Sequence, residues 1–167
     1  MTRGAPGAGK STFLRAHNLW ALTVSPDQIR DDLGGLFEDD AGHIQRGAVA
    51  EAEVWRTVER DLHARMVDGR HVIIDATFQK TRDFEMPGRL AQAHGYRQAV
   101  LDFTMVPVEV ALERNRLRSG RAKVPEAVIR RAYARFRKNK PSTTLAVIGF
   151  EDFPGHAVYG EIGGTIA

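Results

Sequence analysis

A glycine-rich stretch at the start of the chain constrains the fold more than any other feature. It reads Gly4-Ala5-Pro6-Gly7-Ala8-Gly9-Lys10-Ser11, is followed by Thr12, and matches the phosphate-loop pattern G-x-x-x-x-G-K-[ST] at every fixed position. The glycines let the backbone curl around a phosphate and point several N–H groups at it. We expect Lys10 to reach the β- and γ-phosphates and the Ser11 hydroxyl to coordinate Mg²⁺. A helix from Ser11 to about His17 would aim its positive end at the same anion.

Short apolar runs separated by helical patterns fill the rest of the chain. Runs at 20–24, 71–74, 99–105 and 145–150 have the length of buried strands. A helical pattern contains Ile44, Ala48, Ala52, Trp55, Leu62 and Met66, and Gly69 can end that helix. Pro107 and Pro125 suit the first turns of two later helices. Strands that alternate with helices predict an α/β fold, in which a parallel β-sheet is sandwiched by α-helices.

Length and composition indicate one globular unit. The chain has 167 residues, of which 43% are hydrophobic and 27% charged. We expect a domain over residues 1–150 and a C-terminal tail over residues 151–167. The chain has no cysteine, which excludes disulfides, thiolate metal sites and a thiol nucleophile. It has neither a secretory signal nor an apolar run near the roughly 20 residues that cross a bilayer, so we expect a cytoplasmic protein with no membrane partner.

The formal net charge of +3 conceals an uneven charge distribution. Residues 111–140 contain eleven basic and two acidic residues, a net charge of +9. The rest of the chain contains 13 basic and 19 acidic residues, a net charge of −6. A basic segment on an acidic body favours a phosphate-rich partner, and a solvated helix face is the structural alternative.

An aspartate and an arginine, three residues apart, follow the apolar run that ends at Val24. In the segment S-P-D-Q-I-R, Asp27 and Arg30 share one face of a helical turn. Ligands bind at the carboxyl ends of strands in α/β sheets. Asp27 could therefore accept the proton of an attacking hydroxyl, while Arg30 grips a neighbouring anion. A plain helix N-cap is the alternative role for Asp27.

Another acid ends the apolar run at 71–74. The segment His71-Val72-Ile73-Ile74-Asp75-Ala76-Thr77 has the Walker-B form, in which an aspartate follows a buried strand. We expect Asp75 either to join the Mg²⁺ shell or to orient Arg30, and a loop-starting aspartate is the structural alternative. Asp75 and Thr77 are therefore candidate residues on the acceptor side.

An arginine-rich break lies between two helical patterns. The segment reads E-R-N-R-L-R-S-G-R-A-K-V-P over residues 113–125. Its Ser-Gly pair ends the first helix, and Pro125 starts the next. We interpret the break as a short lid over a triphosphate, because phosphoryl transfer depends on cations that stabilise charge on the phosphate oxygens.

Together these segments resemble the P-loop 5′-hydroxyl polynucleotide kinases, the kinase half of phage and bacterial end-healing enzymes. The matching segments are G-A-P-G-A-G-K-S, S-P-D-Q-I-R, V-I-I-D-A-T and E-R-N-R-L-R-S-G-R-A-K-V-P, spread over nearly the whole chain. The resemblance implies a P-loop kinase fold with an arginine-rich lid, ATP and Mg²⁺ as cofactors, and 5′-hydroxyl ends of RNA or DNA as partners. It also implies the cytoplasm of a bacterial or phage-infected cell, and a homo-oligomer is compatible with the sequence.

The resemblance assigns a role to each candidate residue. Lys10 and Ser11 hold ATP and the metal, with the remainder of the loop from Gly4 to Thr12 around the phosphates. Asp27 is the general base on the 5′-hydroxyl, and Arg30 binds the phosphate next to the acceptor nucleoside. Arg118 is the best match for the lid arginine that contacts the donor phosphates. The implied catalytic set is therefore Asp27, Lys10 and Arg118.

The chain departs from the family pattern at three places. The lid is one residue longer, so Arg114 or Arg121 can share the role of Arg118 in binding ATP. Phe78 stands where the family often has asparagine. Only three residues precede Gly4, so the strand that normally leads into the phosphate loop is either a stub or begins further upstream.

The C-terminal residues 156–167 are similar to the start of the haloacid-dehalogenase-type phosphatase that follows the kinase in two-domain relatives. That motif is an apolar strand followed by D-x-D-G-T, and here Glu161 and Gly163 occupy the two aspartate positions. We expect a remnant without 3′-phosphatase activity. A glycine-rich tail without such a history is the alternative.

Three functions are compatible with these motifs. The first is transfer of the ATP γ-phosphate to 5′-hydroxyl ends in nucleic acid repair, which the basic segment favours because a nucleic acid end brings several phosphates. A P-loop kinase acting on a small-molecule hydroxyl would use the same loop and base. A non-catalytic ATP-binding switch would need only the loop.

Overall fold

The computed structural model describes residues 1–34, 36–38, 44–46, 49–141, 145–149 and 152. Apart from Asp152, the predicted tail over residues 151–167 lies outside the described residues, and so do Glu161 and Gly163. The phosphatase-like remnant and its boundary with the preceding domain therefore stay predictions.

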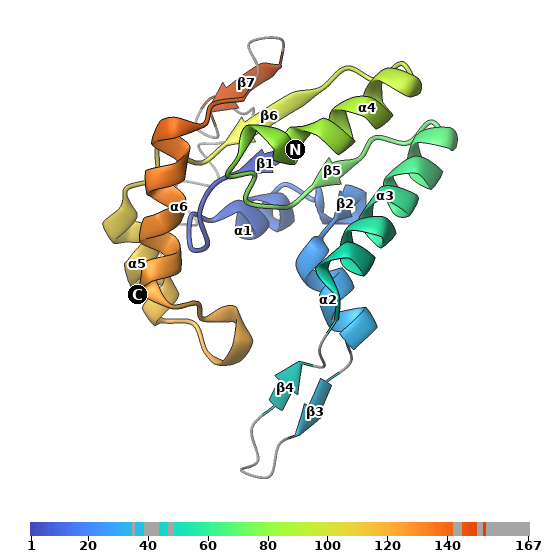
Figure 1. Ribbon diagram of the computed structural model, residues 1–167. Helices are drawn as coiled ribbons and strands as arrows, with labels where there is room; N and C mark the ends of the chain where they lie inside the picture. The colour runs from blue at the N-terminus through green and yellow to red at the C-terminus, as the bar shows by residue number, and fades with distance from the viewer. Residues whose placement is uncertain (35, 39–43, 47–48, 142–144, 150–151, 153–167) are drawn as a thin grey trace.

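Short parallel strands form the centre of the fold (Figure 1). Their bounds are β1 (Thr2–Arg3), β2 (Thr23–Val24), β5 (Ile73–Ile74), β6 (Ala99–Asp102) and β7 (Ala146–Gly149). β6 lies between β1 and β7 in one sheet, and β2 pairs with β5 in another, every pair being parallel. The two sheets meet at β1 and β5, beyond which the backbone N–H of Gly4 donates to the carbonyl of Thr77 over 3.2 Å. The strand that leads into the phosphate loop has two residues here.

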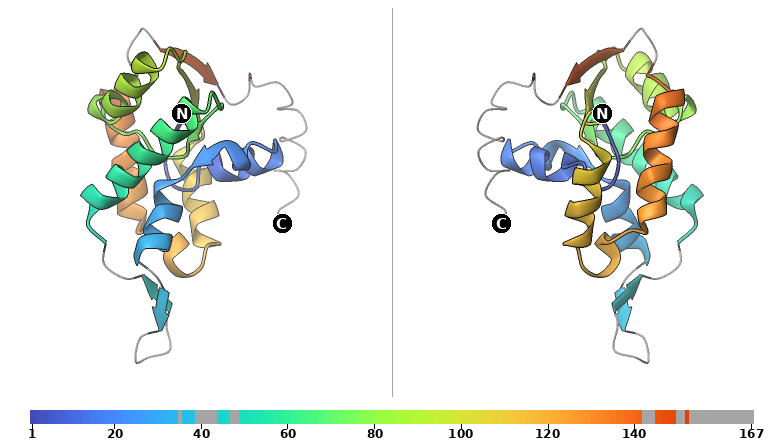
Figure 2. Two further views of the ribbon diagram at one scale, coloured as in Figure 1. Left: turned by 90° about the vertical axis from the view of Figure 1, so that its right-hand side faces the viewer. Right: turned by 90° about the vertical axis from the view of Figure 1, so that its left-hand side faces the viewer.

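Helices cover both faces of these strands. Their bounds are α1 (Lys10–Ala16), α2 (Pro26–Gly34), α3 (Glu51–Val67), α4 (Glu85–Ala93), α5 (Val108–Arg116) and α6 (Glu126–Lys138). Short 3₁₀ turns lie at η1 (Trp20–Leu22), η2 (Thr81–Phe84) and η3 (Gly120–Ala122). In Figure 1 α3 and α4 lie in front of the strands, and Figure 2 shows α1 on the opposite side. The predicted α/β fold is confirmed.

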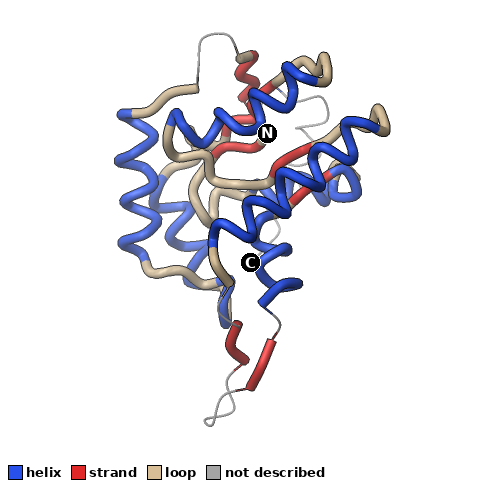
Figure 3. The backbone as a smooth tube through the Cα atoms, turned by 45° about the vertical axis from the view of Figure 1, so that its right-hand side comes forward, coloured by secondary structure: helices blue, strands red, loops and turns tan. Residues whose placement is uncertain are grey.

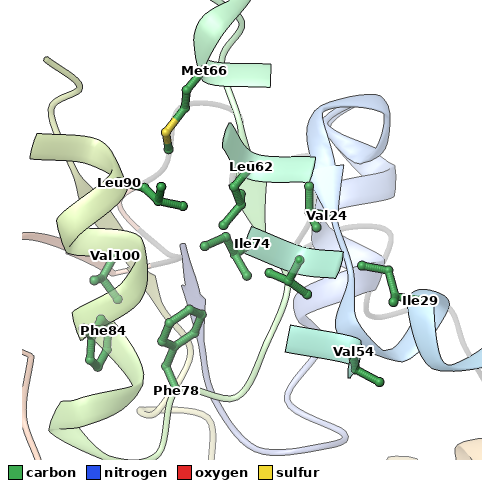
Figure 4. Close-up of a cluster of buried hydrophobic side chains, with 11 residues drawn as sticks. Val24, Ile29, Val54, Leu62, Met66, Ile74, Phe78, Phe84, Leu90 and Val100 are labelled. Carbon is green, nitrogen blue, oxygen red and sulfur yellow. The ribbon is translucent and has the colours of Figure 1, made fainter. Parts of the chain in front are cut away.

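Successive strand residues point to opposite faces and anchor both helix layers. Ile74 and Val100 lie in a buried cluster with residues of α3 and α4, shown in Figure 4. Their neighbours Ile73 and Leu101 pack against a second cluster that contains Phe13 of α1. Because side chains alternate across a strand, strands that are apolar at successive positions must be covered by helices on both sides.

The helix predicted from Ile44 begins later than the apolar spacing indicated. α3 starts at Glu51, after Ala50 in an extended conformation (φ −65°, ψ 127°). Residues 44–46 instead form β4 (Ile44–Arg46), which pairs antiparallel with β3 (Leu36–Glu38). This hairpin projects from the body beyond α2 and α3 (Figure 3). A pairing of three residues leaves no periodic signal, so the spacing of Ile44 with the following helix was misleading.

The buried stripe of α3 also differs from the predicted one. The buried residues are Val54, Val58, Leu62 and Met66, which recur every four positions. Leu62 and Met66 were predicted, whereas Ala52 is exposed. Two valines one turn apart complete the face that packs on the strands.

The predicted strands are longer than the observed ones. Trp20–Leu22 is a 3₁₀ turn, so β2 retains only the end of the run at 20–24. The run at 99–105 continues past β6, where Phe103 is still fully buried although it is not in the strand. The run at 145–150 does form a strand, β7, but Ala146, Val147 and Ile148 are exposed, so the expectation that this strand is buried is wrong. An apolar run therefore fixes neither the length of a strand nor its burial.

The predicted helix boundaries are close to the observed ones. Gly69 follows α3 with φ 69°, the left-handed conformation typical of a residue just after a helix. Pro107 and Pro125 lie one position before α5 and α6 rather than in their first turns. None of the helices in the described part of the chain is long and apolar enough to cross a membrane.

Candidate active site

The phosphate loop connects β1 to α1 and holds its lysine in place. The Nζ of Lys10 donates to the carbonyls of Gly4 (2.9 Å) and Ala5 (3.1 Å). Burial lowers the pKa of Lys10 from its ordinary value, and the nearby Asp75 carboxylate opposes this shift. A bound phosphate would supply the anionic partner that two neutral carbonyls cannot provide for a buried cation.

The backbone of Gly7 packs directly on α5. Gly7 has φ 85°, and a Cβ at this position would lie 2.3 Å from the carbonyl oxygen of Ala111. Only glycine satisfies both the left-handed conformation and this close approach. The loop is therefore seated on the helix that leads into the predicted lid.

A cleft of about 660 Å³ opens over the phosphate loop. The predicted site residues that line it are Pro6, Gly7, Gly9, Lys10, Ser11, Thr12, Asp27, Arg30, Asp75, Thr77 and Arg118. Gly4, Ala5 and Ala8 are buried within the loop. Arg114 is exposed, does not line the cleft and lies near Tyr133, where its charge opposes the rise in the pKa of that phenol caused by burial. The side chain of Arg121 lies outside the described residues. The structure thus brings most of the predicted site residues to one cleft. The predicted roles of Arg114 and Arg121 in ATP binding stay predictions.

Ser11 and Asp75 present adjoining oxygen atoms at the end of β5. Ser11 Oγ donates to Asp75 Oδ2 over 2.5 Å, and Thr2 Oγ1 donates to Asp75 Oδ1 over 3.0 Å. Of the two roles predicted for Asp75, this geometry fits the metal shell, because Arg30 takes other partners. Within the described residues, no group of three or more His, Asp or Glu side chains could hold a metal. A cation at Ser11 and Asp75 would therefore complete its shell with phosphate and water oxygens, as Mg²⁺ commonly does.

Asp27 and Arg30 form an ion pair in the first turns of α2. Arg30 Nη1 lies 2.6 Å from Asp27 Oδ1. The N-cap interaction is made by Ser25, whose Oγ accepts from the backbone N–H of Gln28 over 3.4 Å. Asp27 lies inside the helix, so the N-cap role considered for it is wrong. Its side chain is 82% exposed and lines the cleft, where an incoming hydroxyl can reach it.

Arg30 pairs not only with Asp27 but also with Glu51, the first residue of α3. Arg30 Nε donates to Glu51 Oε1 over 2.6 Å, and Nη2 donates to Oε2 over 2.9 Å. This interaction is the largest cause that raises the pKa of Arg30. Glu51 was not predicted from the sequence because it lies 21 residues from Arg30, beyond a hairpin whose second strand was interpreted as part of a helix. Nothing in the local sequence marks the pairing.

Arg118 reaches the cleft from the lid. Its Nη1 donates to the carbonyl of Ala122 over 3.3 Å, across the turn η3. Burial lowers the pKa of Arg118, and the charge of Asp27 opposes that shift. Arg118 in turn contributes to the lowered pKa of Lys10. Because interactions between charges weaken with distance and screening, these mutual effects place Lys10, Asp27 and Arg118 in one electrostatic environment.

Asn115, which the sequence analysis did not single out, closes the lid at its base. Its Nδ2 donates to the carbonyl of Val124 over 2.8 Å, and its Oδ1 accepts from the N–H of Val124 over 3.0 Å. The residue is 1% exposed. The side chain thus ties the end of α5 to the residue that precedes Pro125, which fixes the span of the loop that carries Arg118.

Phe78, the departure from the family pattern after β5, belongs to the core. It is buried, and its ring packs on Phe84 with centroids 4.8 Å apart (Figure 4). Its backbone is left-handed (φ 45°), and its carbonyl accepts from Nε of Arg3 over 3.4 Å. The side chain does not line the cleft, so the phenylalanine anchors the loop that carries Asp75 and Thr77 instead of serving the site.

A phosphate loop on a short central strand, an acid at the end of the neighbouring strand and an arginine-bearing lid around one cleft define a P-loop kinase-like domain. The chain belongs to the AAA domain family, whose model matches residues 1–139. The predicted resemblance to polynucleotide kinases is confirmed at the level of this fold, which also supports nucleotide binding.

The solved structures that are similar to the chain include the following two. One is a chain of the Pnkp1/Rnl/Hen1 RNA repair complex, with 23% identity and a TM-score of 0.63 over 82% of this chain. The present chain spans 43% of that longer chain. The other is assigned as a kinase from Chloroflexus aurantiacus, with 16% identity and a TM-score of 0.56, and the match covers 98% of this chain and 92% of that one. No curated protein matches the chain. At these identities the likeness establishes the fold.

Proposed function

We propose that this domain transfers the γ-phosphate of ATP to the 5′-hydroxyl end of a nucleic acid, RNA or DNA, in strand repair. The observation that carries the proposal is the convergence of Asp27, Lys10 and Arg118 on one cleft. Phosphoryl transfer to a hydroxyl needs a base for the hydroxyl proton and cations for the phosphate oxygens. The three side chains supply these functions.

In the proposed reaction, Asp27 accepts the proton of the 5′-hydroxyl while that oxygen attacks the γ-phosphorus. The bond from the γ-phosphorus to the β–γ bridging oxygen breaks, and ADP leaves with the electron pair. Arg30 holds Oδ1 of Asp27, so Oδ2 is the oxygen that we expect to take the proton. Lys10 and Arg118 stabilise the charge on the phosphate oxygens.

Mg²⁺ fits beside Ser11 and Asp75, whose hydroxyl and carboxylate oxygens are the hard ligands that this ion prefers. When bound there, the ion would neutralise charge on the β- and γ-phosphates. Ser11 and Asp75 already contact each other, so their side chains need little rearrangement to face a common ion.

The basic segment supports a nucleic acid acceptor over a small molecule. α6 buries Ile129, Ala132 and Phe136, and its exposed basic residues are Arg130, Arg131, Arg137 and Lys138. Between α5 and α6 the chain forms only η3 and short connections, so the basic residues of α6 come directly after the lid in the sequence. A strand that brings several phosphates gains binding energy from such a surface, whereas an uncharged small acceptor does not. One structural neighbour comes from an RNA repair complex, which is in keeping with this acceptor.

Transfer of label from γ-labelled ATP to 5′-hydroxyl oligonucleotides of RNA and DNA tests the proposal. Wild type should label the ends, with a KM for the oligonucleotide that rises steeply with salt. Asp27→Asn should lose at least about a hundredfold in rate, the usual contribution of a general base. Lys10→Ala should be at least as impaired. The matched control is Arg60→Gln, because Arg60 pairs with Asp61 on an exposed part of α3.

The outcomes separate the three candidate functions. Absence of label on every oligonucleotide overturns the proposal. Label on a small hydroxyl acceptor alone would establish a small-molecule kinase, whose KM for an uncharged acceptor should respond little to salt. Tight ATP binding without transfer to any hydroxyl would establish a switch. Full activity in Asp27→Asn would remove that residue from the role of base.

A further inference from the structure

Arg15 and Trp20 form a stacked pair on the wall of the cleft, and the proposed phosphoryl transfer uses neither. The Cζ atom of Arg15 lies 3.9 Å from the centroid of the Trp20 ring. Both residues line the cleft; Arg15 is exposed and Trp20 is half-buried. A cation that stacks on a ring at this distance holds its guanidinium plane against one aromatic face.

The pair lies on the acceptor side of the cleft. Arg15 follows Ser11 by one turn of α1, so the two side chains share a helix face. Ser11 contacts Asp75 at the end of β5, and β5 pairs with β2, which leads into Asp27. The opposite flank of the phosphate loop packs on α5, as the contact of Gly7 shows. Arg15 therefore lines the cleft together with Asp27, on the helix face that carries Ser11.

Contacts with the core anchor the aromatic half of the pair. Trp20 packs against the buried cluster that contains Phe13 and Phe103. The turn η1 that carries it is held by two hydrogen bonds at Leu19, whose N–H donates to Leu14 over 2.7 Å and whose carbonyl accepts from Thr23 Oγ1 over 3.0 Å. The ring is thus a fixed support, and the exposed Arg15 side chain above it lines the cleft.

We propose that the Arg15–Trp20 pair binds a nucleobase near the 5′ end of the acceptor strand, with the base stacked on the open face of the Arg15 guanidinium. This inference rests on the proposed function. Bases of unpaired strands stack on aromatic rings and on arginine planes, and every base offers such a face. The subsite therefore accepts the end of a strand with little preference for sequence, and it gives an acceptor with bases an advantage over a bare sugar-phosphate chain.

Paired acceptors test the inference. One oligonucleotide carries normal nucleotides at its 5′-hydroxyl end, and the other carries abasic sugars at its first two positions. For wild type we expect a KM about tenfold lower for the acceptor with bases. Arg15→Gln and Trp20→Leu should abolish this preference and leave the KM for ATP unchanged, whereas Trp20→Phe should retain most of it. The control Arg60→Gln should behave like wild type.

The inference is overturned if wild type does not distinguish the two acceptors, or if the variants raise the KM for ATP in place of the KM for the acceptor. Trp20→Leu removes part of a packed cluster, so thermal denaturation should accompany its kinetics. If that variant is unfolded, Arg15→Gln and Trp20→Phe still decide the question, because neither removes a buried side chain.

Fluorescence gives a readout that does not require transfer. The chain has two tryptophans, so Trp55→Phe leaves Trp20 as the reporter. The acceptor with bases should quench its emission in the absence of ATP, and the abasic acceptor should not. Quenching by ATP alone would assign the pair to the donor and overturn the inference. Transfer without quenching would overturn the inference alone, and quenching without transfer would overturn the proposed function alone.

Discussion

Arg30 is bound by both oxygens of Glu51, at 2.6 and 2.9 Å, as well as by Oδ1 of Asp27 at 2.6 Å. This interaction ties the first turns of α2 and α3 together beside the cleft. Two carboxylates therefore surround the cation that we expect to receive the phosphate of the acceptor. Glu51 holds the guanidinium in the cleft, and it also competes with any anion that binds there.

The competition predicts a gain of acceptor affinity in Glu51→Gln. Removal of one of the two carboxylate charges that pair with Arg30 should lower the KM for a 5′-hydroxyl oligonucleotide about threefold, because an exposed ion pair is worth about 0.2–1 kcal/mol. The KM for ATP should not change. Steady-state kinetics measure both constants. Glu59→Gln serves as the control, because Glu59 lies on α3 like Glu51 but pairs with the exposed Arg89 of α4. An increase in the KM for the oligonucleotide would instead show that Glu51 positions Arg30.

Asp75→Asn should weaken the response to Mg²⁺. The substitution keeps the size of the side chain but removes the charge beside Ser11. We expect the Mg²⁺ concentration that gives half-maximal transfer to rise by at least about tenfold, as is usual when a group that supports a metal is lost. A titration of the rate with Mg²⁺ measures the change. Asp61→Asn, at a position that does not line the cleft, should leave the curve unchanged. An unchanged curve in Asp75→Asn would argue against a metal at this position.

Asn115→Ala should loosen the lid and destabilise the fold. The substitution leaves the N–H and carbonyl of the half-buried Val124 without their partner, and such a loss inside a protein typically costs about 1–3 kcal/mol. Denaturant unfolding measures this loss. The KM for ATP should rise as well, because Arg118 lies within the loop that Asn115 closes. Asn139→Ala, which removes a single half-buried bond to Arg135, should affect ATP binding much less. An unchanged KM for ATP would separate the lid from donor binding.

Because of Tyr133, we expect the free energy of unfolding to depend on pH in the alkaline range. Its hydroxyl donates to the carbonyl of Val106 over 2.5 Å. Burial, and then the charge of Glu109, raise the pKa of Tyr133 from 10.0 to about 12, with Arg114 opposing the shift. Between these two values the folded chain keeps a proton that the unfolded chain has released, so the free energy of unfolding should fall as the pH rises through this range. Below this pH range, the phenol of Tyr133 adds nothing to the pH dependence of the free energy of unfolding.

Unfolding by denaturant at a series of alkaline pH values checks this expectation. Tyr133→Phe has no phenolic proton, so its free energy of unfolding should fall less steeply than that of wild type between pH 10 and about 12. Equal slopes for the two proteins over that range would contradict the assignment.

The sequence by itself determined the features that arise from neighbouring residues. The phosphate loop needs glycines, a lysine and a serine at set positions, and their chemistry is readable without the fold. The end of α3 and the starts of α5 and α6 followed from Gly69, Pro107 and Pro125, because glycine accepts the left-handed conformation after a helix and proline fixes its own φ. The pairing of Asp27 with Arg30 was readable for the same reason, since one helical turn brings them together.

Only the tertiary structure decided the contacts between segments far apart in the chain. Glu51 reaches Arg30 across a hairpin, and the stacked pair of Arg15 and Trp20 depends on how η1 turns back against α1. The structure also put Arg118 in the cleft and Arg114 outside it, although both are lid arginines in the sequence. Helical periodicity and motif spacing describe residues within a few positions of one another. The direction of a side chain toward a distant segment depends on packing, which no local pattern records.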